Sequence, residues 1–333
     1  MSRPTILDVA ERAGVSKSLV SLVMHDSPYV SDERRAAVHE AIRELGYRPN
    51  AVARSLVRQR SYVLGVMLSN LHNPFFADLV DGIEEQALES GYRALFNSGK
   101  RDPQREAVAL ETLLELQTDG LILAGTLLDM KTINEAGQSV PTVIITRATR
   151  SRVVDSVNGD DRTGAGIAVD HLVSIGHRRV AHIDGGVGAG AKPRRSGYKA
   201  AMKRHGLEPI VVPGSYTEHG GSQGVARLIE MNAHPTAILA ANDLAALGAL
   251  QALADADRAV PDDVSVVGYD NAWLAELRHV SLTTIDQPSE EMGATAVRLL
   301  IERLDEGRTD ARHIVLAPSL VVRSTTAPPA RGL

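Results

Sequence analysis

Hydrophobic residues in the first 46 positions recur at helical spacing in three short segments. The first segment, 5–13, ends before Gly14, and Ser16 is suited to cap the second. The third begins at Ser31, where two acids follow at the positive end of a helix dipole, and it ends at Gly46. The predicted buried stripes are Ile6, Val9, Ala10 and Ala13, then Val20, Val23 and Met24, then Val38, Ala41, Ile42 and Leu45. Three short helices with a four-residue turn between the first two are typical of a helix-turn-helix.

A fourth short segment follows this helical head and joins it to the rest of the chain. Asn50 can cap a helix that runs from residue 51 to about residue 58. A helix of that length is marginal in water by itself. Because it lies between two larger units, we predict that residues 1–46 form the head and residues 47–60 form a hinge.

From residue 61 the pattern changes to apolar runs that alternate with amphipathic segments. Strands are predicted at 62–68, 93–97, 120–124, 142–145, 179–183, 237–240 and 264–268. Predicted helices between them include 75–90, 103–117, 162–175, 194–205 and 242–256. Such alternation indicates parallel sheets covered by helices on both faces, and about 270 residues of it suggest two lobes. The predicted fold class is therefore α/β, with an all-α head, a two-lobed core at 61–325 and a tail at 326–333.

The composition is that of an ordinary water-soluble globular protein, with 44% hydrophobic and 23% charged residues. No apolar run has the length of a membrane span, and the first residues lack the apolar stretch of a secretory signal. The chain has no cysteine, which excludes disulfides, cysteine-ligated zinc and thiol catalysis. We therefore expect a protein of the reducing cytoplasm, with no membrane partner.

Charge is distributed unevenly along the chain. The net charge is −5, yet residues 1–60 hold ten Lys and Arg against seven Asp and Glu. Within that part, residues 46–60 carry four arginines and no acid. A basic strip beside an acidic body suggests a nucleic-acid contact confined to one end. A solvated helix face explains the same charges equally well.

Several motifs resemble those of the LacI/GalR family of repressors. Residues 5–21 read T-I-L-D-V-A-E-R-A-G-V-S-K-S-L-V-S, where the family follows roughly T-hydrophobic-x-D-V-A-x-x-A-G-V-S-x-x-T-V-S. Further matches are Val30-Ser31, 45–50, 53–56, Gly65-Val66, 73–76, 119–122, 171–172 with 176–178, Asn242-Asp243, 268–270, 282–285 with 287–288, and Val322-Arg323. The resemblance spans nearly the whole chain. It implies a helix-turn-helix head on a core like that of periplasmic binding proteins.

The resemblance also implies which residues of the head contact operator DNA. A helix in the major groove needs short or polar side chains at its leading end, and Lys17, Ser18, Ser21 and Leu22 occupy the first turns of the second helix. Many relatives carry Arg, Lys or His in place of Leu22, which could contact only a thymine methyl group. Leu22 could instead pack inside the head, but another face of the helix already fills that role. The full implied set is Thr5, Ser16, Lys17, Ser18, Ser21, Leu22, Asn50, Ala53, Arg54, Leu56 and Arg58.

Within the hinge, the resemblance implies that Leu56 wedges between the central base pairs of the minor groove, which kinks the duplex. Ala53 would permit close approach and Arg54 would meet phosphates. The alternative is that Leu56 packs only against a partner hinge. Family members dimerise through the core, so we expect a homodimer on a near-palindromic operator with a central CG step. The chain ends A-P-P-A-R-G-L, which cannot form the leucine-rich heptads of tetrameric relatives.

Open parallel sheets bind ligands at the carboxyl ends of their strands, so loops after the predicted strands are candidates for an effector site. By resemblance, Arg194, Asp270 and the Asn242 loop correspond to effector-binding positions, and Phe75 and Tyr216 to aromatic ones. An aromatic face with Asp and Arg suits a sugar ring with vicinal hydroxyls. The full expected set is Asn70, Phe75, Phe76, Arg147, Arg194, Tyr216, Asn242, Asp243 and Asp270. Helix capping is the alternative role for Asn242 and Asp243, and core packing is the preferred alternative for Phe76.

Motifs for other kinds of chemistry are weak or absent in the sequence. A loose G-x-G-x-x-A at 186–191 is weak evidence for a dinucleotide site, and we interpret it as an effector loop. No phosphate-binding P-loop, H-E-x-x-H or EF-hand pattern occurs, so we expect no cofactor and no metal. His171 and His177 are expected to be structural. Capping or hydration is the default for Asp160 and Asp161, although this pair resembles a motif near the family's cleft.

Two rival classes of function remain at this stage. A transport-type sugar-binding protein shares the two-lobed core, but it would need export and has no use for residues 5–58. A sugar-processing enzyme would need a nucleophile, metal site or acid–base pair, and none stands out. We therefore expect a DNA-binding regulator, a repressor whose operator affinity is controlled by a small molecule between the lobes. The sequence leaves open which sugar binds and whether it releases DNA or promotes binding.

Overall fold

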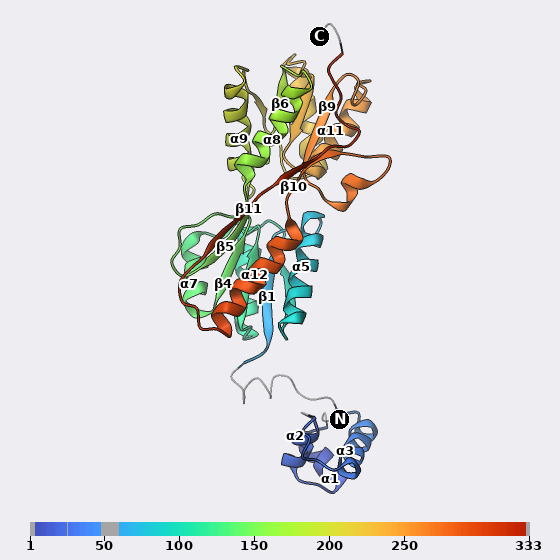
Figure 1. Ribbon diagram of the computed structural model, residues 1–333, viewed down its shortest axis with the longest axis vertical. Coiled ribbons are helices and arrows are strands. Elements are labelled where there is room, and N and C mark those ends of the chain that lie inside the picture. Colours follow the sequence, from blue (N-terminus) through green and yellow to red (C-terminus); the bar gives the residue numbers. More distant parts are fainter. Residues whose placement is uncertain (1–3, 25, 48–59, 331–333) are drawn as a thin grey trace. The chain divides into compact units, whose positions relative to one another are not determined.

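The computed structural model describes residues 4–24, 26–47 and 60–330, and the chain divides into a unit at Met1–Ser61 and a unit at Tyr62–Leu333. The smaller unit, the head, contains α1 (Ile6–Ala13), α2 (Lys17–Met24) and α3 (Asp32–Leu45), as Figure 1 shows. Thr5 and Asp8 form a reciprocal capping box at the start of α1, and Ser16 accepts from the Leu19 amide at the start of α2. Gly14 and Gly46 end α1 and α3 in the left-handed conformation that favours glycine. The three predicted helices of the head are confirmed.

The buried side chains of the head follow the predicted stripes. Val9, Val20 and Val38 have no exposed surface, and each comes from a different helix. Val30 lies between α2 and α3 and joins the same core. One small core therefore fixes the three helices of the head to one another.

The larger unit, the core, consists of two lobes, each built on a six-stranded sheet. The strands of the first lobe lie in the order β11 (His313–Leu316), β5 (Asp155–Gly159), β4 (Thr142–Ile145), β3 (Gly120–Ala124), β1 (Val63–Leu68) and β2 (Arg93–Ser98). Its helices are α5 (Phe75–Glu89), α6 (Pro103–Glu115), α7 (Met130–Ser139) and α12 (Ser289–Leu304). Every strand pairing in this sheet is parallel.

The second lobe repeats this plan with one reversed edge strand. Its strands lie in the order β12 (Ser319–Val321), β10 (Thr283–Asp286), β9 (Ser265–Asp270), β8 (Ala237–Ala240), β6 (Val180–Ile183) and β7 (Ile210–Val212). Its helices are α8 (Asp161–Ser174), α9 (Ala191–Arg204), α10 (Glu218–Glu230), α11 (Asp243–Asp255) and the short 3₁₀ helix η1 (Trp273–Glu276). Among the described strands, β12 alone pairs antiparallel, against β10.

Both faces of each sheet are covered by helices, which explains why the strands are continuously apolar. In the first lobe, Leu64, Val66 and Leu68 face α5 and α12, whereas the intervening Met67 faces α6 and α7. In the second lobe, α10 and α11 cover one face and α8 and α9 cover the other. The predicted α/β class with two parallel-sheet lobes is confirmed.

The chain passes between the two lobes three times within its described residues. The passages lie between β5 and α8, between β10 and α12, and between β11 and β12. The helix α12 therefore packs on α5 of the first lobe, although it follows the second-lobe strands in sequence (Figure 1). The carboxyl ends of the parallel strands of both sheets border the region where the lobes meet.

All seven predicted strands are present, but five strands were not predicted: β5, β7, β10, β11 and β12. The strand β5 reads D-S-V-N-G, a polar run that is buried because Arg303 and Arg308 neutralise Asp155. The two edge strands β11 and β12 are short and half exposed, so they lack a strong apolar signal. Among the helices, α7, α10 and α12 were not among those named from the sequence.

The last described residues of the chain are hydrogen-bonded to the second lobe. The Val266 amide donates to the Thr325 carbonyl at 2.8 Å. His177, which is buried, bonds Ala327, and His171 bonds Thr326. Both histidines are thus structural, as expected, and burial lowers the pKa of each. The expected tail at 326–333 begins with residues that belong to the packing of the lobe.

No helix in the described part of the chain is both long enough and apolar enough to cross a lipid bilayer.

Candidate functional site

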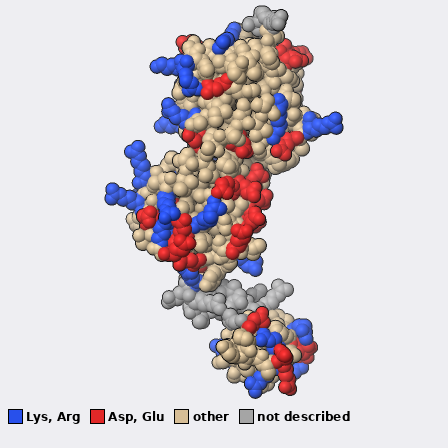
Figure 2. Space-filling model, viewed as in Figure 1, with Lys and Arg blue, Asp and Glu red and all other residues tan. Residues whose placement is uncertain are grey.

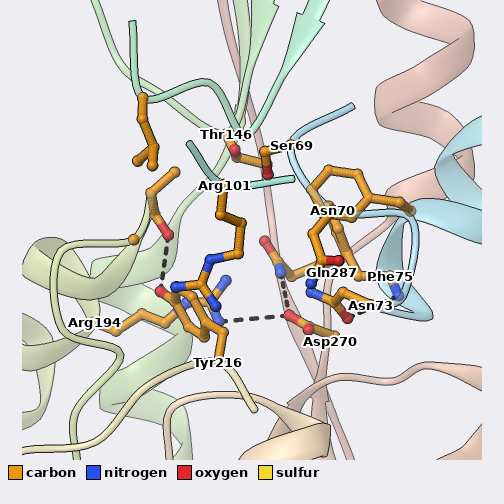
Figure 3. Close-up of a pocket in the computed structure, with 15 residues that line it drawn as sticks. Ser69, Asn70, Asn73, Phe75, Arg101, Thr146, Arg194, Tyr216, Asp270 and Gln287 are labelled. Carbon is orange, nitrogen blue, oxygen red and sulfur yellow. Dashed lines mark hydrogen bonds and ion pairs between the residues drawn. The ribbon is translucent and has the colours of Figure 1, made fainter. Parts of the chain in front are cut away.

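A cavity lies between the two lobes, lined by loops that follow the strands of both sheets (Figure 3). From the first lobe it is lined by Ser69, Asn70, Asn73, Phe75, Phe76, Arg101, Gly125, Leu127 and Thr146, and from the second by Gly188, Ala189, Arg194, Tyr216, Asp270 and Gln287. Six of the nine expected effector residues are among them. The free space is narrow, about 60 Å³, which is enough for a few water molecules. A ligand of sugar size therefore requires the walls to move apart.

Arg194 is the buried cation of this cavity. Its Nε donates to Asp161 Oδ1 at 2.7 Å, and its Nη1 donates to the Ala241 carbonyl at 2.7 Å and reaches Asp270 Oδ1 at 3.5 Å. The guanidinium carbon lies 3.7 Å from the ring centroid of Tyr269, close enough for a cation–π contact. Burial alone would lower the pKa of Arg194, but the two carboxylates outweigh it and keep the side chain charged.

Asp270 is the buried acid of the same group. Burial raises its pKa from 3.8 to about 6, and the nearby charge of Arg194 and the amide of Gln287 oppose that rise. Gln287 Nε2 donates to Asp270 Oδ1 at 2.7 Å, as drawn in Figure 3. Gln287 itself lies at the passage between β10 and α12, so the acid is held by a residue that joins the lobes.

Aromatic side chains supply the apolar part of the lining. Tyr216 donates its hydroxyl to the Ala189 carbonyl at 2.8 Å, and its ring centroid lies 5.5 Å from the guanidinium carbon of Arg194. Phe75 and Phe76, at the start of α5, are buried and meet edge to face with centroids 5.3 Å apart. Apolar faces beside fixed polar groups are characteristic of pockets that bind small molecules.

Three lining residues have unusual backbone conformations. Arg101, Thr146 and Asp270 have φ angles of 57°, 67° and 120°. Non-glycine residues with such positive φ values are uncommon, and they cluster at functional sites where the surrounding structure holds the strain. The loops around the cavity therefore place their side chains at the cost of unfavourable backbone conformations.

The head presents a separate candidate surface on α2. Lys17 and Ser18, in its first turn, are exposed, and Leu22 is 46% exposed one turn later. The expectation that Leu22 is exposed rather than packed inside the head is confirmed, since Val20 and Val23 fill the interior. Thr5 and Ser16 are also exposed, each at the start of a helix that it caps.

Several acidic side chains of the core gather on one face of its first lobe. Figure 2 shows them along the face formed by α5 and α12, where a groove is lined by Asp78, Glu85, Glu89, Glu290 and Glu291. Burial and the neighbouring carboxylates raise the pKa of Asp78. A polyanion such as DNA would be repelled from this face.

Comparison with known proteins finds family models that match the head and part of the core. Residues 5–50 match the model of bacterial regulatory proteins of the lacI family, and residues 169–326 match a periplasmic binding protein-like domain. The ribose operon repressor of Escherichia coli strain K12 is 36% identical over 327 residues, which cover 96% of this chain and 99% of the repressor. The chain belongs to the lacI family of bacterial regulatory proteins.

Two solved structures extend the likeness of this lacI-family regulator to three dimensions. The lac repressor dimer bound to operator and the anti-inducer ONPF aligns with a TM-score of 0.87 at 30% identity, covering 98% of this chain and 100% of that one. A LacI-family regulator from Enterococcus faecium with bound ribose aligns with a TM-score of 0.72 at 28% identity, covering 80% and 99%. The relatives are DNA-binding regulators rather than enzymes, and this chain is a transcriptional regulator of the same kind.

Three expected effector residues of this regulator do not line the cavity. Arg147 turns aside and donates to the Leu128 carbonyl. Asn242 caps α11 by accepting from the Ala245 amide at 2.9 Å. Asp243 is buried and accepts from the Ala272 amide and from Thr284 Oγ1, which braces the loop after β9. For Asn242 and Asp243 the structure thus favours the alternative weighed from the sequence, a role in capping and bracing.

The sequence did not single out several residues that the structure brings to the site. Asp161 was expected to cap or to be hydrated, yet only Asp160 caps α8, and Asp161 pairs with Arg194. Gln287 belongs to a matched motif, but nothing in the sequence assigns it a role. Nothing in the sequence distinguished Arg101 from other arginines.

Part of the expected DNA-binding set lies outside the described residues. These positions are Asn50, Ala53, Arg54, Leu56 and Arg58.

Proposed function

We propose that this lacI-family regulator binds a small polyhydroxylated ligand of the sugar type between the lobes of its core, and that this binding controls its affinity for operator DNA. The observation that carries the proposal is the arrangement of Arg194 and Asp270, fixed 3.5 Å apart beside the ring of Tyr216. Paired donors and acceptors next to an aromatic face match the vicinal hydroxyls and the apolar face of a sugar ring.

The narrowness of the cavity supports the link between ligand and DNA. A ligand that must part the lobes changes the geometry of the core when it binds. The ligand can shift the regulator between two conformational states only by the difference between its binding free energies for those two states. The direction of the shift, release of DNA or tighter binding, follows from which state the ligand favours.

We further propose that the regulator acts as a homodimer on a near-palindromic operator. One head presents one short recognition helix, which buries too little surface for specific binding by itself. The alignment with a repressor solved as an operator-bound dimer supports this assembly. Lys17, Ser18, Ser21 and Leu22 are the proposed base-contacting residues, with the hinge set from Asn50 to Arg58 at the minor groove. Because its target is chromosomal DNA, we infer that it acts in the cytoplasm.

The test is a DNA-binding selection followed by affinity measurements. Sequences that the full-length protein retains from a random pool are expected to show two-fold symmetry. Fluorescence anisotropy then measures operator affinity in the presence of a panel of pentoses, hexoses and their derivatives. At least one compound should change the affinity of the wild type. Absence of any selected sequence would overturn the proposal.

Asp270→Asn tests whether the response arises in the cavity. The substitution keeps the shape of the side chain but removes an acceptor charge, so it should abolish the response to the effector and leave operator affinity unchanged. Asp262→Asn, an equal change at an exposed loop position, is the matched control and should respond like the wild type. An unchanged response in Asp270→Asn would move the effector site elsewhere.

A further inference from the structure

Three charged residues line the cavity, and they are not equally compensated. Arg194 and Asp270 come from the second lobe, and Arg101 comes from the first. The second-lobe pair is joined by Asp161, so Arg194 has two carboxylates at 2.7 and 3.5 Å. This half of the cavity carries no surplus positive charge.

Arg101 is different because no acid compensates it. Among the described residues, no carboxylate lies within ion-pair distance of its guanidinium and no group accepts a hydrogen bond from it. The adjacent Asp102 is turned away, since its carboxylate caps α6 through the Arg105 amide at 3.0 Å. Glu106 packs against Gly99, and its Oε2 accepts hydrogen bonds from Thr126 Oγ1 and from the Leu127 amide.

The backbone at Arg101 directs the side chain toward the cavity. The Arg101 amide donates to the Ser69 carbonyl at 2.7 Å, and the residue has a φ of 57°. Figure 3 shows the side chain extending from the first lobe into the space next to Tyr216. An arginine that extends into a pocket and has no acid beside it is suited to bind an anion.

The rest of the first-lobe wall fits an anion as well. Its polar lining consists of hydroxyl and amide groups, those of Ser69, Asn70, Asn73 and Thr146, and it contains no Asp or Glu. Hydroxyl and amide groups can donate to an oxyanion without charge repulsion. The cavity is thus divided into a first-lobe wall with an uncompensated cation and a second-lobe wall whose arginine is compensated by carboxylates.

We propose that the effector carries an oxyanion, a phosphate ester or a carboxylate, which pairs with Arg101 while its hydroxylated part contacts Arg194, Asp270 and Tyr216. The inference rests on the proposed function, because it specifies the ligand of the same cavity. A bidentate arginine–oxyanion pair also gives the ligand one attachment on each lobe.

Binding of the anion alone gives a test that needs no knowledge of the natural effector. Inorganic phosphate is titrated at constant ionic strength while the thermal unfolding of the full-length protein is recorded. Phosphate should stabilise the wild type and Lys100→Gln against thermal unfolding. Its affinity for Arg101→Gln should be at least roughly tenfold lower, because a charge-assisted hydrogen bond is lost. Lys100 is exposed, does not line the cavity and loses the same charge, which makes it the matched control.

Matched pairs of ligands then identify the source of the anion. Ribose is compared with ribose 5-phosphate, and glucose with glucose 6-phosphate and gluconate, by calorimetry on the wild type, Arg101→Gln, Arg101→Lys and the control Lys100→Gln. An anionic member should bind the wild type at least about tenfold more tightly than its neutral parent, and Arg101→Gln should erase the difference. Arg101→Lys keeps the charge but loses the bidentate geometry, so it should retain part of the difference. Tighter binding of the sugar phosphates than of gluconate identifies a phosphate ester as the anion, and the reverse order identifies a carboxylate.

The inference is overturned if phosphate protects Arg101→Gln as well as the wild type, if phosphate binds neither, or if neutral sugars bind as tightly as their anionic forms. Failure of the proposed function has a different signature. In that case ligands bind the cavity, with or without preference for an anion, but none of them alters operator affinity.

Discussion

Arg194 Nε lies 2.7 Å from Asp161 Oδ1, and the two residues come from the first turns of neighbouring helices, α9 and α8, of the same lobe. Both side chains are almost fully buried. The cation of the cavity is therefore oriented from within the second lobe before any ligand or the first lobe contributes. The side chain of Arg194 has already lost its conformational entropy on folding. A ligand that binds it therefore does not have to order this side chain.

Asp161→Asn should weaken effector binding roughly tenfold or more and should destabilise the core by about 3–5 kcal/mol, because it leaves Arg194 buried with one carboxylate fewer. Calorimetry and urea unfolding measure the two effects. Asp160→Asn is the control on the neighbouring residue, where asparagine can still cap α8. Equal behaviour of the two variants would mean that Asp161 does not orient Arg194.

Asp270 should give the core a characteristic dependence of stability on pH. Burial raises its pKa to about 6, so the folded state holds the proton more tightly than the unfolded state, in which the pKa is near 3.8. The group then contributes stability at acid pH that is lost as the pH rises from about 4 to about 6, a change of about 3 kcal/mol. The difference in unfolding free energy between wild type and Asp270→Asn, measured from pH 4 to 7.5, should fall over that range and then level off. A flat difference would contradict the raised pKa.

Leu22→Ala should reduce affinity for the selected operator and relax the preference at the base pair it contacts. Its exposed side chain can add only an apolar contact with a thymine methyl, so the loss should be about 1 kcal/mol, at the lower end of the range for a base contact. Leu7→Ala provides the control, because Leu7 is 62% exposed on α1 and undergoes the same change. Anisotropy with operators altered at single positions measures the effect, and identical specificity profiles for wild type and Leu22→Ala would refute the contact.

Asp155→Ala should destabilise the first lobe by about 3–5 kcal/mol without changing the effector site directly. Asp155 has no exposed surface and binds Arg303 and Arg308, both largely buried, so its removal leaves two arginines in the interior with one counter-charge fewer. Asp310→Ala is the surface control, since that carboxylate is 73% exposed. Urea unfolding of both variants should separate them clearly, and similar midpoints would show that the network is dispensable.

The sequence predicted most of the fold because the central strands and the head helices carry strong periodic signals. It predicted Arg194, Asp270 and Tyr216 for the cavity because each corresponds to a position that binds the effector in the family that the chain resembles. It could not separate Asp160 from Asp161, since adjacent carboxylates at the start of a helix look alike until the helix fixes which one points inward. It could not find β5 either, because the charge that makes this strand polar is compensated by arginines about 150 residues away.

The three passages of the chain between the lobes mean that neither lobe is a continuous stretch of the gene. The first lobe needs residues 63–159 together with 289–316, and the second needs 161–286 together with 319–327. A product truncated near residue 288 would lose the helix that packs on α5 and so would lack part of the lobe encoded first. Exchange of one lobe with that of a relative would need three joints rather than one. Recombination between relatives can therefore exchange the core only as a whole, whereas it can exchange the head at a single boundary.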